Sequence, residues 1–253
     1  IMKSGIYRKI LLRREQKHKM IAVLLDPGCC MGRHLVKIVA QMKTYTPDFV
    51  FVGGSHIHAS IEHLIDLLKE ELTSDIILFP GNASQFTKNA DAMLYLSLIS
   101  GRNPEYLIGQ HVQSAKLIRD SGLEVIPTAY LLIEGGKTSS VMYMSNTMPI
   151  PRDKNEIASS TAIAGELLGM HMAYLEAGSG AELPVPAEMI QHVSEEISVP
   201  LIVGGGIKTE EQLKTAFDAG ADLVVIGNIF ETNPEKIETL IEFTKRYNAM
   251  HQI

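Results

Sequence analysis

Eight short runs of apolar residues recur along the chain, each bounded by turn-forming residues and most of them followed by a segment of helical periodicity. The runs are almost continuously hydrophobic rather than alternating, which is typical of parallel strands covered on both faces. They predict strands at residues 20–27, 49–54, 75–81, 92–99, 124–133, 171–178, 200–206 and 222–228. The segments between them predict helices at Arg33–Tyr45, Ile57–Leu72, Pro104–Ser121, Asn155–Leu168, Ala187–Ile197, Glu210–Ala219 and Pro234–Arg246.

Strands that alternate with helices in this way predict an α/β fold, namely a (β/α)8 TIM barrel that occupies residues 1–253 as a single domain. An open doubly wound sheet is the alternative, because closure of the sheet leaves no mark on the sequence. Two irregularities are expected. A helical segment precedes the first strand, and the stretch "NASQFTKNA" in the third βα unit is too short for a full helix and predicts a loop.

The segment at residues 134–154 is unusually long for a connection inside a compact domain, and long loops of this kind are often functional. It carries Met142, Met144 and Met148. These flexible apolar side chains either form a lid over a binding site or pack into the body of the domain, and both interpretations stand at this point.

The composition limits the range of partners. The chain has 253 residues, of which 45% are hydrophobic and 21% charged, and its formal net charge is -6. An acidic chain lacks the basic surface that nucleic acid requires, although backbone amides can still bind a phosphate group. Cys29 and Cys30 are adjacent, so we interpret them as free thiols in a reducing compartment. No apolar run approaches membrane-spanning length, which predicts a cytoplasmic protein, with contact to a membrane surface left open.

Three consecutive predicted strands in the second half end in small residues. The sixth ends in Gly178-Ser179-Gly180, the seventh in Gly204-Gly205-Gly206 and the eighth in Gly227-Asn228. In a barrel these ends are neighbours, and glycine lets backbone N–H groups approach phosphate oxygens. We therefore predict a phosphate site here. The alternative is that the glycines serve only the turns, since turns need glycine anyway.

The first two predicted strands end in Asp26 and Ser55. Each residue could simply cap the following helix. Placed at adjacent strand ends, the two oxygen ligands could instead share a magnesium ion, which typically takes few protein oxygens and completes its shell with water and phosphate. His56 and His58 lie at the same end, and we interpret them as residues at the start of a helix.

Several familiar chemistries are disfavoured. Lys88, Lys137 and Lys208 lie in predicted loops and no strand interior contains a lysine, which argues against a Schiff-base enzyme. The chain also has neither a serine nucleophile elbow nor a dinucleotide-binding Gly-x-Gly-x-x-Gly motif after the first strand.

The motifs "YLEAGSGA", "VGGGIK" and "VIGNIF", together with "LLDP" and "FVGGS" near the start, closely resemble the geranylgeranylglyceryl phosphate synthase family, which includes the heptaprenylglyceryl phosphate synthases. The resemblance covers essentially the whole chain, and the segment from Leu131 to Pro151 is more similar to the branch with geranylgeranyl specificity. It implies a magnesium-dependent TIM-barrel prenyltransferase of membrane ether-lipid synthesis. Such enzymes join the C3 hydroxyl of sn-glycerol 1-phosphate to a polyprenyl diphosphate and release pyrophosphate.

Transferred to this chain, the resemblance implies that Asp26 and Ser55 hold magnesium on the prenyl diphosphate. It also implies that sn-glycerol 1-phosphate is surrounded by Tyr174, Leu175, Glu176, Ala177, Gly178, Ser179, Gly180, Gly205, Gly206, Gly227 and Asn228. Within this set Ser179 and Gly180 would face the phosphate. Glu176 would then meet the glycerol hydroxyls, orient the C3 hydroxyl and accept its proton as the catalytic base. The alternative for Glu176 is a pure binding role.

The family resemblance also implies a groove for the prenyl chain, for which residues 92–99, 124–133 and the methionine-bearing segment are the candidates. We expect a homo-oligomer with small-molecule substrates. Two other functions stay open from the residues alone. An isomerase or lyase of a sugar phosphate would need a second acid or base opposite Glu176, and a noncatalytic sensor would bind the phosphate ligand without turnover.

Overall fold

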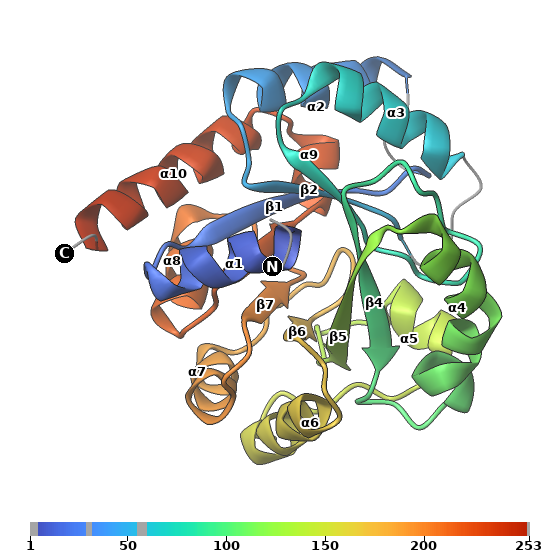
Figure 1. Cartoon of the computed structure of the whole chain (residues 1–253). Helices are drawn as coiled ribbons and strands as arrows, with labels where there is room; N and C mark the ends of the chain where they lie inside the picture. Colours follow the sequence, from blue (N-terminus) through green and yellow to red (C-terminus); the bar gives the residue numbers. More distant parts are fainter. Residues whose placement is uncertain (1–4, 29–31, 55–59, 252–253) are drawn as a thin grey trace.

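The apolar runs form eight parallel strands in the computed structural model, which describes residues 5–28, 32–54 and 60–251. The strands are β1 (Met20–Leu25), β2 (Phe49–Val52), β3 (Asp75–Leu78), β4 (Ala92–Leu98), β5 (Glu124–Leu132), β6 (Met172–Glu176), β7 (Leu201–Gly204) and β8 (Leu223–Ile226). Each strand pairs with the next, and β8 pairs with β1, so the sheet closes into a barrel (Figure 1). This closure confirms the predicted (β/α)8 barrel and excludes the open doubly wound sheet.

Helices surround the barrel (Figure 1). They are α1 (Ile6–Glu15), α2 (Gly32–Thr44), α3 (Ile61–Glu71), the π-helical turn η1 (Glu105–Gly109), α4 (Gln110–Ser121), α5 (Ser140–Ser145), α6 (Asn155–Leu167), α7 (Ala187–Glu196), α8 (Glu210–Asp218), α9 (Asn228–Thr232) and α10 (Lys236–His251). The predicted helix at Pro104–Ser121 is thus divided into η1 and α4. The helix predicted to end at Arg246 continues to His251.

Every strand ends one to three residues earlier than its apolar run predicts. The run at 200–206 shows the reason. Gly205 and Gly206 have φ angles of +81° and +76°, a left-handed conformation that no strand continues through. The residues that follow the strands therefore form loops at the C-terminal end of the barrel, where ligands bind in this fold.

The third βα unit contains no helix, as the sequence predicts, because residues 79–91 pass from β3 to β4 in turns and irregular backbone. Gln85 fixes this connection. Its side-chain Oε1 accepts a hydrogen bond from the Gly81 N–H (2.9 Å), and its Nε2 donates to the Gly54 carbonyl (2.7 Å). The buried amide therefore joins the ends of β2 and β3.

The core has two layers, which follow from the period-two alternation of side chains along a strand. In β6, Met172 and Tyr174 belong to the cluster inside the barrel, whereas Ala173 and Leu175 belong to the cluster between the sheet and the helices. The same alternation turns the next side chain, Glu176, toward the barrel interior, where it is only 5% exposed.

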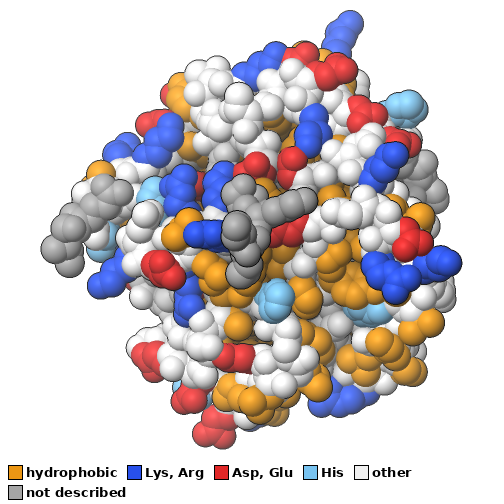
Figure 2. All heavy atoms as spheres, in the orientation of Figure 1, with side chains coloured by type: hydrophobic (Ala, Val, Ile, Leu, Met, Phe, Trp, Pro, Cys, Tyr) orange, Lys and Arg blue, Asp and Glu red, His pale blue; other side chains and the backbone are white. Residues whose placement is uncertain are grey.

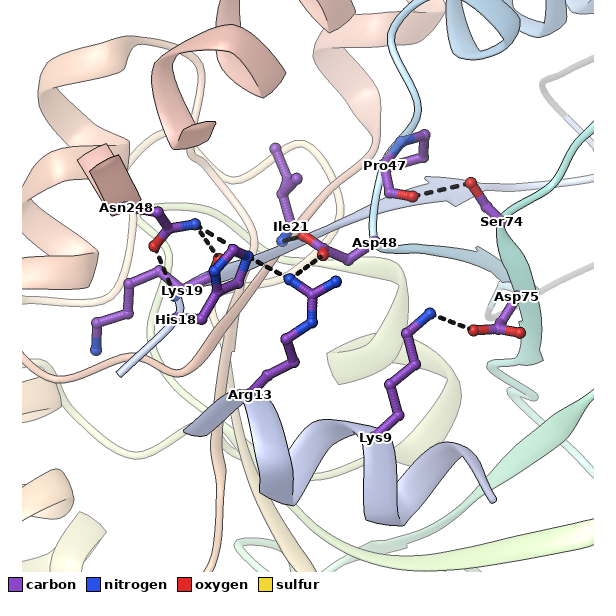
Figure 3. Close-up of polar contacts among 10 residues, drawn as sticks. All are labelled: Lys9, Arg13, His18, Lys19, Ile21, Pro47, Asp48, Ser74, Asp75 and Asn248. Atoms are coloured by element: carbon purple, nitrogen blue, oxygen red, sulfur yellow. Dashed lines mark hydrogen bonds and ion pairs between the residues drawn. The ribbon is translucent and has the colours of Figure 1, made fainter. Parts of the chain in front are cut away.

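Helix α1, the predicted segment before the first strand, closes the N-terminal end of the barrel. Its Ile6 and Ile10 join the interior cluster. Figure 3 shows two of its charged side chains reaching the start of the sheet. Lys9 Nζ lies 2.6 Å from the Asp75 carboxylate, and Arg13 lies 3.8 Å from that of Asp48. Since α1 occupies this end, a ligand site inside the barrel has to open at the opposite end.

The long segment between β5 and α6 contains α5 and returns to the sheet through a parallel bridge between Ile133 and Ile150. Its three methionines differ in how far their side chains are buried. Met142 packs against the cluster inside the barrel, whereas Met144 is 42% and Met148 75% exposed. Packing into the body therefore describes Met142 alone.

The surface is mixed in character. Figure 2 shows basic and acidic side chains intermingled around α1, and hydrophobic side chains gathered below them in the region of α4 and α6. Leu117 of α4, Leu167 of α6 and the following Leu168 are 58%, 83% and 74% exposed. None of the helices in the described part of the chain combines the length and apolar character needed to cross a membrane.

Candidate active site

The C-terminal ends of the strands surround a cavity of about 270 Å³. Most of the predicted site residues line it, although they come from four different strand ends. They are Asp26, Tyr174, Glu176, Ser179, Gly180, Gly205, Gly206, Gly227 and Asn228. The barrel brings these residues together because β6, β7, β8 and β1 are consecutive neighbours in the closed sheet.

Three predicted ligand-binding residues do not line this cavity. Leu175 and Ala177 have side chains in the cluster between the sheet and the helices, since the alternation that turns Glu176 inward turns them outward. The Gly178 N–H donates instead to Glu176 Oε1 over 2.6 Å. These three residues therefore shape the loop after β6 rather than the wall of the cavity, and their predicted place around glycerol phosphate stays a prediction.

Glycine is required at the end of β7. A Cβ at Gly205 would lie 2.5 Å from Glu176 Oε1, and one at Gly206 would lie 2.9 Å from the carbonyl carbon of Leu183. Both residues also have positive φ angles. The backbone of this loop therefore approaches the Glu176 carboxylate and the neighbouring loop more closely than any side chain would allow.

Asn228 joins the loop after β6 to the end of β8. Its Oδ1 accepts hydrogen bonds from the Ser179 hydroxyl (3.0 Å) and from the Gly180 N–H (2.7 Å). Asn228 is also the first residue of α9. Two of the three small-residue loops predicted to form the phosphate site are thus in direct contact.

Glu176 lies deep in the cavity. Burial raises the pKa of its carboxyl, while the neighbouring Tyr174 hydroxyl and the Gly178 N–H lower it. The Tyr174 hydroxyl is itself buried and has no well-aligned hydrogen-bond partner in the described part of the chain. A carboxyl with a raised pKa beside a hydroxyl that has no partner can bind ligand hydroxyl groups and accept a proton from one of them.

Asp26 follows β1 at the edge of the same cavity and is half-buried. Burial raises the pKa of its carboxyl, and a hydrogen bond from the Gly28 N–H (2.8 Å) lowers it. The other oxygen, Oδ2, lies 2.3 Å from the point where a Cβ of Gly54 would stand if this glycine had a side chain. Asp26 therefore lies against the loop after β2. Asp26 forms no ion pair with the described residues.

The second predicted metal ligand, Ser55, lies outside the described residues, as do His56 and His58. Asp26 alone is consistent with a magnesium site, because a half-buried carboxylate without a cationic partner supplies the hard oxygen that magnesium prefers. Within residues 5–28, 32–54 and 60–251, no three His, Cys, Asp or Glu side chains form a cluster that would hold a metal without help from substrate oxygens.

Sequence reasoning missed two charged residues of the cavity, Glu231 and Lys208. Burial raises the pKa of Glu231 and the nearby Asp26 carboxylate raises it further, while the opposing His34 and Asn228 lower it. The sequence did contain a signal for Glu231. Glu231 follows Asn228 by three residues on a helix and therefore lies on the same face as Asn228. Lys208 Nζ donates to the Ala181 carbonyl.

A second, apolar cavity adjoins the first and forms a groove. Gly54, Phe79, Tyr130 and Val141 line both. The groove continues between β4 and α4 along Met93, Tyr95, Leu96, Leu98, Tyr106, Gln110, His111, Ser114 and Met144. The loop that replaces a helix after β3 forms part of its wall, through Pro80, Gly81, Asn82 and Ala83. Residues from 92–99, from 124–133 and from the methionine-bearing segment, the candidates for a prenyl groove, all contribute to its lining.

Comparison with known proteins shows the family of this chain. Residues 12–244 match the model of the PcrB family. The geranylgeranylglyceryl phosphate synthase of Chitinophaga pinensis is 43% identical over 95% of this chain and 96% of its own length, and that of Flavobacterium johnsoniae is 44% identical over 91% and 95%. The crystal structure of (S)-3-O-geranylgeranylglyceryl phosphate synthase from Thermoplasma acidophilum, in complex with its substrate sn-glycerol-1-phosphate, superposes with a TM-score of 0.89 at 31% identity, covering 96% of this chain and 99% of that one.

Proposed function

The chain belongs to the PcrB family, and we infer from this that it is a geranylgeranylglyceryl phosphate synthase, which transfers a prenyl group from its diphosphate to the C3 hydroxyl of sn-glycerol 1-phosphate. The observation that carries this inference is the cavity at the C-terminal ends of the strands. Eight of the eleven residues predicted to bind glycerol phosphate line it, including the Glu176 carboxylate, and an apolar groove adjoins it. The function therefore follows from this site together with the relatives.

We place glycerol phosphate with its phosphate group at the loops after β6, β7 and β8. Backbone N–H groups near Gly206 and Asn228 would bind the phosphate oxygens, as would the Ser179 hydroxyl. The glycerol end would then point into the barrel, where Glu176 and the Tyr174 hydroxyl meet its hydroxyl groups.

The proton of the C3 hydroxyl has to leave as the ether bond forms. Glu176 is the carboxylate at this depth of the cavity, so we assign proton acceptance to it. The allylic carbon of the prenyl group stabilises positive charge by itself. The remaining work of the protein is therefore to align the hydroxyl with that carbon and to exclude water.

We propose that Asp26, with Ser55, holds a magnesium ion against the diphosphate. When bound, the ion would neutralise the charge that develops on the departing pyrophosphate. The Asp26 carboxylate fits this role, because it is half-buried at the edge of the cavity and lacks a cationic partner among the described residues.

We assign the prenyl tail to the apolar groove beside β4. Ala83 on its wall provides a test, because Ala83→Phe narrows the groove while the glycerol phosphate loops stay unchanged. The KM for a C20 prenyl diphosphate should rise more than that for a C10 diphosphate, and the KM for glycerol phosphate should stay the same. Equal changes for both prenyl lengths would place the tail elsewhere.

We also propose contact with a membrane surface from the cytoplasmic side, since the prenylated product is a lipid. Residues 138–151 carry no charge and lie beside the groove, with Tyr143 80% and Met148 75% exposed. Flotation with neutral phosphatidylcholine vesicles tests this contact. Met148→Ser should weaken flotation, whereas Met250→Ser, at an equally exposed methionine (76%), should not.

The exposed apolar side chains of α4 and α6 support the proposed homo-oligomer, because isolated monomers rarely expose large apolar patches. Light scattering of the purified protein measures its mass directly. Leu167→Ser combined with Leu168→Ser should reduce that mass if this face is the interface.

The activity is tested by incubating the protein with sn-glycerol 1-phosphate, magnesium and prenyl diphosphates of several lengths. We expect a prenylglyceryl phosphate ether and stoichiometric pyrophosphate. Binding of glycerol phosphate without product would favour the noncatalytic sensor, and conversion of a sugar phosphate would favour the isomerase or lyase.

A further inference from the structure

Lys137 lies next to the loop that forms the phosphate site, although it belongs to the long connection between β5 and α6. Its ammonium nitrogen is 3.6 Å from the point where a Cβ of Gly180 would stand. Gly180 lines the active-site cavity and lies between Ser179 and Ala181. A cation from a separate element therefore approaches the backbone to which we assign the substrate phosphate.

The backbone on both sides of Lys137 is attached to this same loop. Two residues earlier, the Gly135 carbonyl accepts hydrogen bonds from the N–H groups of residues 182–183, over 3.0 and 3.2 Å. Two residues later, the Ser139 Cβ lies 2.6 Å from the Cβ position of Gly178. The position of Lys137 above the loop is therefore fixed by the fold, even though its side chain is exposed.

The cavity has an excess of negative charge, which a further cation would balance when phosphate binds. Among the described residues, three carboxylates line it, those of Asp26, Glu176 and Glu231, against a single ammonium group, that of Lys208. A bound phosphate adds more negative charge to this set, which costs free energy unless cations balance it. Neither Lys137 nor Lys208 pairs with a carboxylate of the described residues.

We propose that Lys137 is a substrate-binding residue whose ammonium group holds the phosphate of glycerol phosphate from the β5–α6 side. Lys208, after β7, reaches the same loop from another element. This inference rests on the proposed function and extends it, because it assigns recognition of the substrate charge to a residue outside the three small-residue loops. It also gives the long connection between β5 and α6 a role in binding the polar substrate.

The Glu182 carboxylate is the nearby group that could attract Lys137 in place of the substrate phosphate, although the two form no ion pair in the structure. Its carboxylate lies 3.5 Å from the Cβ position of Gly136, next to the lysine in the chain. If Lys137 served mainly to pair with Glu182, removing either charge would have the same effect on catalysis. The variants Lys137→Met and Glu182→Gln therefore separate the two roles.

The test measures steady-state kinetics of Lys137→Met, with Lys154→Met as the matched control. Lys154 lies in the same connection and, within the described part of the chain, forms an ion pair only with its neighbour Asp153. Loss of a charged hydrogen bond at a partly exposed site should raise the KM for glycerol phosphate about tenfold in Lys137→Met and leave kcat unchanged. Lys137→Arg should restore most of the affinity. Added salt should weaken glycerol phosphate binding less in Lys137→Met than in the wild type, because one screened attraction is missing.

Three outcomes would overturn the inference. They are an unchanged KM in Lys137→Met, an equal rise in Lys154→Met, and an equal rise in Glu182→Gln. Calorimetric titration with glycerol phosphate measures the same interaction without turnover. It therefore keeps the inference separate from the proposed function, which fails by itself if the wild-type protein makes no ether product.

Discussion

Replacing Glu176 with glutamine removes the negative charge and the basic oxygen while preserving the shape of the side chain. The preserved shape matters, because the Gly178 N–H donates to Oε1 and both Gly204, the last residue of β7, and Gly205 lie close to the same carboxylate. The amide oxygen can still accept the Gly178 N–H, so the loop that holds the phosphate should keep its conformation.

The expected effect on turnover is large and the effect on binding is small. A positioned general base contributes about 10²- to 10⁴-fold to a rate, so kcat of Glu176→Gln should fall by that order. Glutamine still hydrogen-bonds a glycerol hydroxyl, so the dissociation constant of glycerol phosphate should change by less than about tenfold. The assay is product formation under saturating prenyl diphosphate, combined with calorimetric binding of glycerol phosphate. Equal losses in kcat and in affinity would refute the base assignment and leave Glu176 a binding residue.

The pH dependence gives an independent check of the same assignment. Burial raises the pKa of Glu176, and a base has to be ionised to act. The rate of the wild type should therefore fall on acidification at a higher pH than an ordinary glutamate would give, and Glu176→Gln should lack this acidic limb. A carboxyl whose pKa is raised in the folded protein stabilises the fold below its unfolded pKa, and this contribution is lost as the pH rises through the folded pKa. Glu176→Gln should therefore unfold at higher urea concentration than the wild type at neutral pH, and this advantage should vanish in acid.

Three further variants test the rest of the site. Asp26→Ala should lower kcat on the order of 100-fold, since a metal ion contributes several kcal/mol, and a titration with magnesium should no longer restore activity. A magnesium response equal to that of the wild type would exclude Asp26 as the ligand. Gly206→Ala, at a φ of +76° and with the new Cβ 2.9 Å from Leu183, should lose about 1–3 kcal/mol of unfolding free energy in urea and raise the KM for glycerol phosphate; wild-type stability would show that the loop relaxes without strain. Gln85→Ala loses its hydrogen bonds to the loops after β2 and β3, so its free energy of unfolding should fall by about 2 kcal/mol. An unchanged urea midpoint would mean that water replaces the amide.

The sequence by itself determined the alternation of strands and helices and the small residues that follow the last three strands, whereas closure of the sheet into a barrel was decided by the tertiary structure. Continuous apolar runs identify strands that are covered on both faces, and small residues after the last three strands identify the loops where a ligand approaches the backbone. Glu176, Ser179 and Asn228 could be predicted because motif residues at strand ends have only one edge of the sheet at which to meet. The strand lengths were overestimated, since an apolar run continues into residues such as Gly205 whose backbone conformation leaves the strand.

Tertiary structure decided which side chains face the cavity and which residues from distant segments join them. Leu175 and Ala177 belong to the glycine-rich motif, yet the period-two alternation turns their side chains away from the cavity. Lys137 reaches the phosphate loop only because a separate connection is hydrogen-bonded to that loop. The walls of the groove beside β4 come from two strands, from the loops after β2 and β3 and from three helical segments, η1, α4 and α5. Periodicity and motifs describe neighbours along the chain, whereas a cavity is formed by neighbours in space. The charged residues and the walls of this cavity therefore depend on the closed barrel, which brings distant segments together.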